Sequence, residues 1–143
     1  VGQKIKILPQ NKIAKVRGIE THKNKVDELT IGKRAAINLQ FKDKISLKRG
    51  NHLSQNDYFS IYDEALVSVN ILSKSEKPVK NNERIRFYLG TQEVMARIIF
   101  YNSKLIEPGE TAGAILKFER PIICSINEVP DLGIPKMNII FLL

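Results

Sequence analysis

The chain of 143 residues has little cysteine, no tryptophan and no long apolar run. Its single cysteine, Cys124, excludes an intrachain disulfide framework and fits a reducing compartment. No apolar stretch approaches the roughly 18 residues that a membrane-crossing helix requires, so we expect no membrane partner. The sequence also shows no charged-then-apolar leader with a cleavage site. We therefore expect a cytoplasmic protein.

Motifs for catalysis and nucleotide binding are also missing. There is no Gly-x-x-x-x-Gly-Lys-Ser/Thr and no Gly-x-Gly-x-x-Gly. A serine or cysteine nucleophile needs a base, and the two histidines, His22 and His52, fall in or beside predicted turns. Cys124 lies in an apolar run, which predicts a buried side chain with a suppressed thiolate; an enzyme that uses Cys124 is the alternative. We expect no catalytic residue, metal site or cofactor within these residues.

Positive charge is concentrated in the first part of the chain. Residues 1–57 hold 13 lysines and arginines against 5 acidic residues, whereas residues 58–143 hold 10 of each. A basic segment beside a neutral one indicates a polyanionic partner, most simply a nucleic acid. The alternative is a solvated, lysine-rich surface that serves solubility.

Alternating apolar and polar residues predict an all-β protein. The clearest predicted strand is Arg34–Phe41, where Ala35, Ile37, Leu39 and Phe41 share one face. Gly18 is a candidate β-bulge within a second predicted strand, Lys12–His22. Further strands are predicted at 4–8, 65–72, 84–89, 94–101 and 112–118. Short strands separated by Gly and Pro turns are typical of barrels or sandwiches. The polar segment near residues 53–58 indicates a boundary between two parts of the chain, 1–57 and 58–143.

Four phrases in the first part resemble the second domain of translational GTPases. They resemble the family patterns VGDxVxILP, VRGIQxH, AGxRxALNL and IxRGDxL without matching every position, and they occupy residues 1–9, 14–22, 31–39 and 45–53 in the family's order. The second and third phrases look most like selenocysteine-specific elongation factors. Elongation factor Tu and the initiation-factor gamma subunit are the alternatives within this class, and an interaction barrel with no RNA role is the alternative outside it.

The second part resembles the third domain of the same family. Residues 89–98 are similar to the pattern HxGTxEVxARV, and residues 105–121 are similar to LxPGExxxxQLxLExP. The resemblance implies two consecutive antiparallel β-barrels, at 1–57 and 58–143. The family's earlier strands, with Asp-Arg-x-Phe and Gly-x-Val-x-Ser-Gly phrases, do not occur, so we expect a first barrel that is truncated at its N-terminus. Residues 125–143 do not align, and Met137–Leu143 is a candidate final strand.

The resemblance also implies a function. Selenocysteine-specific elongation factors deliver selenocysteinyl-tRNA to the ribosome with GTP, and the two barrels bind the aminoacyl-tRNA. The expected partners are therefore selenocysteinyl-tRNA, the ribosome and the protein's own GTPase domain. GTP and Mg²⁺ would be cofactors of the full-length protein, whereas this fragment would bind neither and would not be an enzyme.

One arginine of the family pattern lines the selenocysteine pocket, and Arg34 occupies that position. Its forked donors suit an anionic selenol or an ester carbonyl. The alternative is that Arg34 packs across the strand and pairs with Glu28. Basic residues that could contact the tRNA backbone without reading sequence are Arg17, Lys23, Lys25, Lys33, Lys48, Arg49, Arg84, Arg86 and Arg97. For each of these, a solvated surface role is the alternative.

Overall fold

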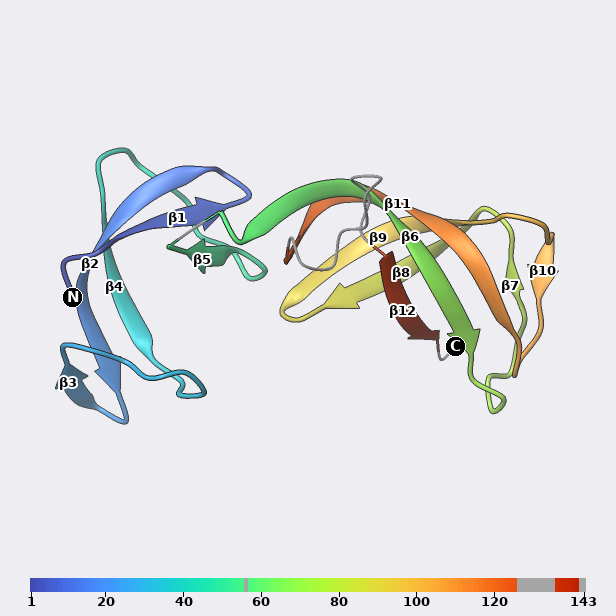
Figure 1. Cartoon of the computed structure of the whole chain (residues 1–143), viewed down its shortest axis with the longest axis horizontal. Coiled ribbons are helices and arrows are strands. Elements are labelled where there is room, and N and C mark those ends of the chain that lie inside the picture. Colours follow the sequence, from blue (N-terminus) through green and yellow to red (C-terminus); the bar gives the residue numbers. More distant parts are fainter. Residues whose placement is uncertain (56, 126–135, 142–143) are drawn as a thin grey trace. The chain divides into compact units, whose positions relative to one another are not determined.

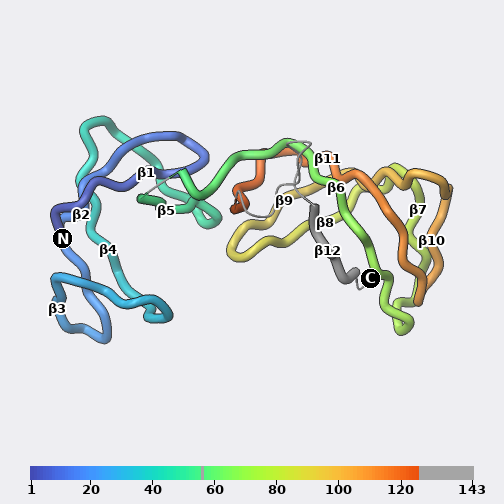
Figure 2. The backbone as a smooth tube through the Cα atoms, in the orientation of Figure 1, coloured from blue at the N-terminus to red at the C-terminus, as the bar shows by residue number. Residues whose placement is uncertain are grey.

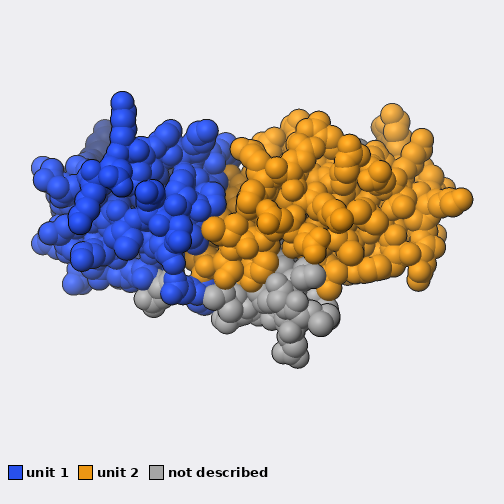
Figure 3. All heavy atoms as spheres, turned by 90° about the horizontal axis from the view of Figure 1, so that it is seen from above, with its two compact units in different colours: residues 1–58 blue, residues 59–143 orange. Residues whose placement is uncertain are grey.

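The computed structural model describes residues 1–55, 57–125 and 136–141. It divides into two compact units, Val1–Tyr58 and Phe59–Leu143, which are coloured separately in Figure 3. The described residues form strands, turns and loops and contain no helix, so the predicted all-β class is confirmed. Within these described ranges, no helix has the length and apolar character needed to cross a bilayer.

The first unit is one antiparallel sheet arranged around β2 (Figure 1). Its strands are β1 (Lys4–Leu8), β2 (Lys12–Thr21), β3 (Asn24–Val26), β4 (Ala36–Phe41) and β5 (His52–Ser54). One edge of β2 pairs with β4, and the other edge pairs first with β1 and then with β3, while β5 pairs with β1. The long strand β2 therefore fixes the positions of three others.

Two sequence expectations concern β2 and β4. The register of the β2–β4 pair shifts between Val16 and Gly18, which confirms the bulge predicted at Gly18. The strand predicted from Arg34 begins at Ala36 instead, so that Arg34 lies just outside the ladder. Ile37 is 40% exposed and does not share the half-buried setting of Leu39 and Phe41. The predicted alternation therefore holds for Leu39 and Phe41, which pack against the core of the first unit, but not for the more exposed Ile37.

The apolar core of the first unit is small. Ile5, Ile7, Ala14 and Val16 are buried together on β1 and β2. The partly buried side chains of Ile19, Leu39 and Phe41 pack against them. Few large side chains therefore hold this sheet together.

The second unit is a larger sheet in the order β12-β6-β11-β9-β8, with a separate two-stranded pair of β10 and β7. The strands are β6 (Phe59–Ile71), β7 (Val79–Lys80), β8 (Glu83–Leu89), β9 (Gln92–Phe100), β10 (Leu105–Ile106), β11 (Thr111–Ser125) and β12 (Lys136–Phe141). Figure 2 follows the backbone through β6, β7, β8, β9, β10 and β11. Every pairing is antiparallel except that of β12 with β6, which is parallel.

The final strand expected at Met137–Leu143 corresponds to β12, and its last two residues lie outside the described residues. β12 occupies one edge of the sheet and β8 the other, and no ladder joins these two strands in the described part of the chain. The antiparallel pairing expected of a translation-factor barrel is confirmed in β6, β8, β9 and β11.

Among the residues whose burial the structure describes, the core of the second unit contains sixteen buried apolar residues, drawn from every strand from β6 to β11. Ile71, Ile98 and Leu116 are fully buried. The rings of Phe87 and Phe118 pack with centroids 5.0 Å apart and an interplanar angle of 50°, a favourable tilted arrangement. The outward side chains of this sheet are therefore presented on a rigid, well-packed base.

Candidate nucleic-acid interface

The β2–β3 hairpin presents two of the predicted basic residues at its tip. Thr21 pairs with Asn24, so His22 and Lys23 form a two-residue turn. Their φ angles of 49° and 66° are those of a type I′ turn, which suits the twist of a hairpin. Lys23 is therefore held at the exposed tip, and Lys25 follows on β3, opposite Glu20.

Arg34 lies beside this hairpin. It is exposed, and its carbonyl oxygen accepts a hydrogen bond from the Thr21 hydroxyl at 2.9 Å. The pairing with Glu28 that was the alternative role is not observed. Among the residues that the structure describes, no carboxylate forms an ion pair with Arg34. The guanidinium is thus available to a ligand, while the backbone of Arg34 is held by the Thr21 hydroxyl.

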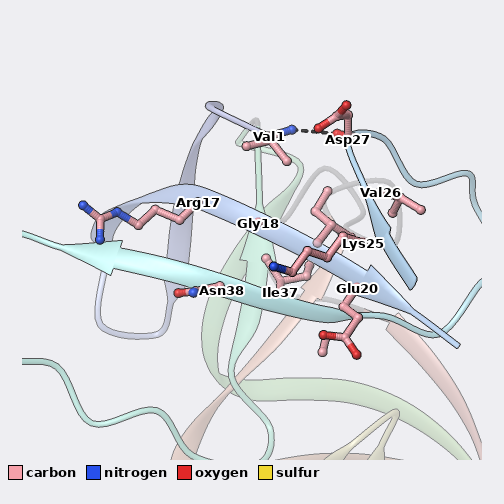
Figure 4. Close-up of a pocket in the computed structure, with 11 residues that line it drawn as sticks. Val1, Arg17, Gly18, Glu20, Lys25, Val26, Asp27, Ile37 and Asn38 are labelled. Carbon is pink, nitrogen blue, oxygen red and sulfur yellow. Dashed lines mark hydrogen bonds between the residues drawn. The ribbon is translucent and has the colours of Figure 1, made fainter. Parts of the chain in front are cut away.

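A surface pocket opens between β2, β3 and β4 close to this hairpin (Figure 4). Arg17, Gly18, Lys25 and Asn38 are among its lining residues, whereas Arg34 is not. Figure 4 shows that the Arg17 side chain extends away from Lys25. The Arg17 Nε donates to Gln40 Oε1 at 3.0 Å, so a neutral partner orients the guanidinium without neutralising it.

Lys33 lies on the approach to β4. It is exposed and follows Gly32, whose φ of 87° is readily adopted only by glycine. Lys33 precedes Arg34 directly, so these two cations come from the same segment beside the hairpin. Together with Lys23 and Lys25, they form a basic group at the end of β2, called the hairpin group below.

Lys48 and Arg49 belong to a different end of the first unit. They form a turn in which the Asn51 N–H donates to the Lys48 carbonyl at 3.1 Å, and the Lys48 N–H donates to Asn51 Oδ1 at 2.8 Å. Gln10, which precedes β2, also donates to Asn51 Oδ1. The ten-residue strand β2 spans about 30 Å, so this turn and the hairpin group lie at opposite ends of β2.

In the second unit, Arg84 is already engaged by a carboxylate. Its Nε and Nη2 donate to the two oxygens of Glu119 at 2.6 and 2.8 Å, a bidentate pair that joins β8 to β11. Hydrogen bonding to Arg84 lowers the pKa of Glu119 below its usual range and raises that of Arg84. A phosphate would have to compete with Glu119 for this arginine.

The other two predicted arginines of this unit also have partners. The Arg86 Nε lies 3.4 Å from Glu93 Oε1, and hydrogen bonding to Tyr88, together with Glu93, raises the pKa of Arg86. Arg97 donates from Nη1 to the Asn82 carbonyl at 3.2 Å, which leaves its charge uncompensated by that contact. Arg97 is therefore the least neutralised of the three.

The strand register brings Arg84, Arg97 and Lys117 into one cross-strand row on the outer face of β8, β9 and β11. Lys117 was not among the sequence candidates. Alternation along β11 could have indicated that it faces outward, but its alignment with Arg97 depends on a pairing between distant segments. Glu119 was likewise missed, because it is 35 residues from Arg84.

The residues with catalytic potential are scattered. His22 is exposed in the hairpin turn, whereas His52 lies on β5 with its Nδ1 3.2 Å from the Gly50 carbonyl. Cys124 is 3% exposed, as predicted. No group of three or more His, Cys, Asp or Glu side chains with the arrangement of a metal site occurs among the described residues.

Comparisons with known proteins define the class. No protein-family model matches the chain. A selenocysteine-specific elongation factor of Desulfomicrobium baculatum is 31% identical over 122 residues, which is 85% of this chain. Elongation factors 1-alpha of Saccharolobus solfataricus and Pyrobaculum calidifontis are 29% and 25% identical, each over 93% of this chain.

The chain is therefore a relative of translation elongation factors. The more particular resemblance, to a selenocysteine-specific elongation factor, is confirmed by the match to the Desulfomicrobium protein. The chain spans about a fifth of that protein (19%) and about a third of the two elongation factors 1-alpha (34% and 33%).

Proposed function

We propose that this chain is the aminoacyl-tRNA-binding part of an elongation factor that delivers selenocysteinyl-tRNA. In this proposal, the first unit corresponds to the factor's second domain and the second unit to its third domain. The observation that carries it is the hairpin group, in which Arg34 lies beside Lys23, Lys25 and Lys33 at one end of β2. A likeness to a selenocysteine-specific factor over 85% of the chain supports the choice of substrate.

The proposed role of Arg34 is to recognise the aminoacyl group. A selenol is ionised near neutral pH, whereas the hydroxyl of serine is not. An exposed guanidinium that pairs with none of the described carboxylates therefore favours selenocysteine over serine by charge-assisted hydrogen bonding. Lys23 and Lys25 then bind backbone phosphates, which provides affinity without sequence readout.

The remaining predicted residues would extend this contact along the tRNA. Arg17 lines the pocket beside the hairpin group, and Lys48 and Arg49 offer a second contact at the far end of β2. On the second unit, Arg97 is the strongest candidate because Arg84 and Arg86 already pair with Glu119 and Glu93. Separated cations on the strands and turns of each unit suit A-form RNA, which is recognised largely by its shape and phosphates.

GTP binding and hydrolysis are assigned to another domain of the full-length protein. Phosphate-loop motifs do not occur in these 143 residues. The proposed full-length protein uses GTP and Mg²⁺ in its GTPase domain and works on the ribosome. GTP turnover by residues 1–143 alone, abolished by a substitution within them, would contradict this assignment.

A second candidate is a general elongation factor that binds many aminoacyl-tRNAs. The similarity to two elongation factors 1-alpha over 93% of the chain favours it. The two candidates share the fold and the phosphate contacts, and they differ in whether Arg34 discriminates between aminoacyl groups.

The test is a binding titration with the GTP-bound full-length protein and matched selenocysteinyl- and seryl-tRNA over a range of salt. We expect affinity to fall steeply with salt, by a log–log slope of about 0.7–0.9 for each phosphate neutralised. Arg34→Ala should weaken selenocysteinyl-tRNA binding selectively. Arg49→Ala, the matched control at the other end of β2, should weaken both tRNAs equally.

Each contrary result selects an alternative. Equal losses for both tRNAs on Arg34→Ala would favour a general elongation factor. Absent or salt-independent binding would overturn the RNA-binding proposal and favour an interaction barrel.

A further inference from the structure

We infer that Thr21 is a positioning residue that fixes Arg34 and couples it to the basic hairpin. The inference rests on the proposed function, because it assigns a purpose to the placement of Arg34. Thr21 contacts neither the tRNA nor the amino acid in this scheme. It acts through the backbone of Arg34.

The position of Arg34 relative to the sheet makes such an anchor necessary. The β2–β4 ladder ends with Glu20 opposite Ala36, so Arg34 lies two residues beyond the last pair. Gly32, in a left-handed conformation, lies two residues further out. The half-buried Thr21 places its hydroxyl 2.9 Å from the Arg34 carbonyl and thus continues the attachment past the end of the ladder.

Thr21 also belongs to the hairpin. It pairs with Asn24 and directly precedes His22 and Lys23, the two turn residues with positive φ. The backbone of Thr21 therefore holds the turn that presents Lys23. The side chain of Thr21 holds the segment that presents Arg34. One side-chain hydrogen bond sets the spacing between the proposed phosphate contact and the proposed aminoacyl contact.

Such spacing affects selectivity more than overall affinity. Phosphate contacts tolerate small movements because they depend mainly on charge, whereas a forked hydrogen bond to one atom requires a fixed geometry. A group that is held in place before binding also loses less conformational freedom on binding. Releasing the Arg34 backbone should therefore reduce discrimination by the guanidinium while the lysines continue to bind.

The test compares Thr21→Val with Thr21→Ser in the GTP-bound full-length protein. Valine keeps the shape and strand preference of threonine but cannot donate, whereas serine keeps the hydroxyl. We expect Thr21→Val to reduce the preference for selenocysteinyl- over seryl-tRNA about fivefold, as for the loss of one ordinary hydrogen bond, with seryl-tRNA affinity unchanged. Thr21→Ser should restore the preference.

Thr111→Val serves as the matched control. Thr111 is an exposed strand residue of the second unit, and its hydroxyl accepts a hydrogen bond from Asn70 at 2.9 Å. The Thr111→Val substitution should leave the preference for selenocysteinyl- over seryl-tRNA unchanged. Amide exchange along β2 should be the same in both Thr21 variants and confirms that each remains folded.

Combination with Arg34→Ala separates this inference from the proposed function. If Arg34→Ala itself leaves the preference intact, the proposed function fails. If Arg34→Ala removes the preference while Thr21→Val keeps it, the positioning role is overturned. If Thr21→Ser reduces the preference for selenocysteinyl-tRNA as much as Thr21→Val does, the positioning role is also overturned. Agreement requires that Thr21→Val add nothing in the Arg34→Ala background.

Discussion

Glu119 accepts two hydrogen bonds from Arg84 and lies near Arg97, so its carboxylate is surrounded by positive charge. These contacts lower its pKa below the ordinary value of 4.5. A carboxylate whose pKa is lowered by folding stabilises the folded state fully when the pH is above its unfolded-state pKa. This stabilisation is lost as the pH falls through the folded-state pKa. The pair is exposed to solvent, so the effect on stability is small.

We therefore predict that Glu119→Gln lowers stability slightly at neutral pH and that the difference from the wild type vanishes in acid. Thermal unfolding of both proteins across the acidic range measures it. Arg84→Gln is the control, because it should raise the pKa of Glu119 in an NMR titration. A Glu119 pKa that does not change in this variant would contradict the assigned cause.

At the scale of single residues, sequence identifies which side chains are charged but not which are already paired. The candidates Arg84 and Arg97 look equivalent in the sequence. Only the register of β8, β9 and β11 shows that Arg84 faces Glu119, whereas Arg97 binds a neutral carbonyl. The sequence could not predict the partner of Arg34 for the same reason. No sequence pattern indicated that the Thr21 hydroxyl would bind the Arg34 backbone.

At the scale of elements, β11 shows how a side chain can replace a missing strand neighbour. The β9–β11 ladder ends at Phe118, and the β6–β11 register shifts before Ile122. Beyond this point, Gln92 accepts from the Ile123 N–H and donates to the Ile123 carbonyl, each at 2.8 Å. Gln92 is 5% exposed, so it satisfies two buried backbone groups.

We predict that Gln92→Leu destabilises the protein by about 3 kcal/mol, because both groups of Ile123 lose their partner in a buried setting. Denaturant unfolding measures the change. Asn70→Ala removes an exposed side-chain hydrogen bond and should have an effect below about 0.5 kcal/mol. An equal loss in both variants would contradict the role given to Gln92.

Strands with several alternating residues could be predicted, and short or interrupted ones could not. β1 begins and ends at the predicted residues, Lys4 and Leu8, and Pro9 ends the strand. β7 and β10 have two residues each, too few for a pattern. The extension of β11 beyond Pro121 was missed because proline normally ends a central strand, whereas here the ladder has shifted.

At the scale of the whole molecule, the two units differ in the amount of buried apolar surface. Of the residues whose burial is described, the first unit has four buried residues in its main apolar cluster and the second has sixteen. Each fully buried aliphatic side chain contributes about 1.5–3 kcal/mol relative to an exposed one. The first unit should therefore open more readily than the second.

Native-state hydrogen exchange tests this difference. We expect amides of β2 and β4 to exchange at least tenfold faster than those of β6 and β11 under the same conditions. Equal protection across all four strands would show instead that the units unfold together. Selective stabilisation of β2 and β4 on adding tRNA would agree with ligand binding at the hairpin group.

The parallel pairing of β12 with β6 has a consequence for the order of synthesis. Leu66 is made long before Lys136, its partner in the sheet, while the opposite edge of β6 is taken by β11. During translation, the edge of β6 that pairs with β12 therefore lacks this strand partner until β12 has been made. Chains that stop before Lys136 would retain this open edge, which can pair with the same edge of another copy.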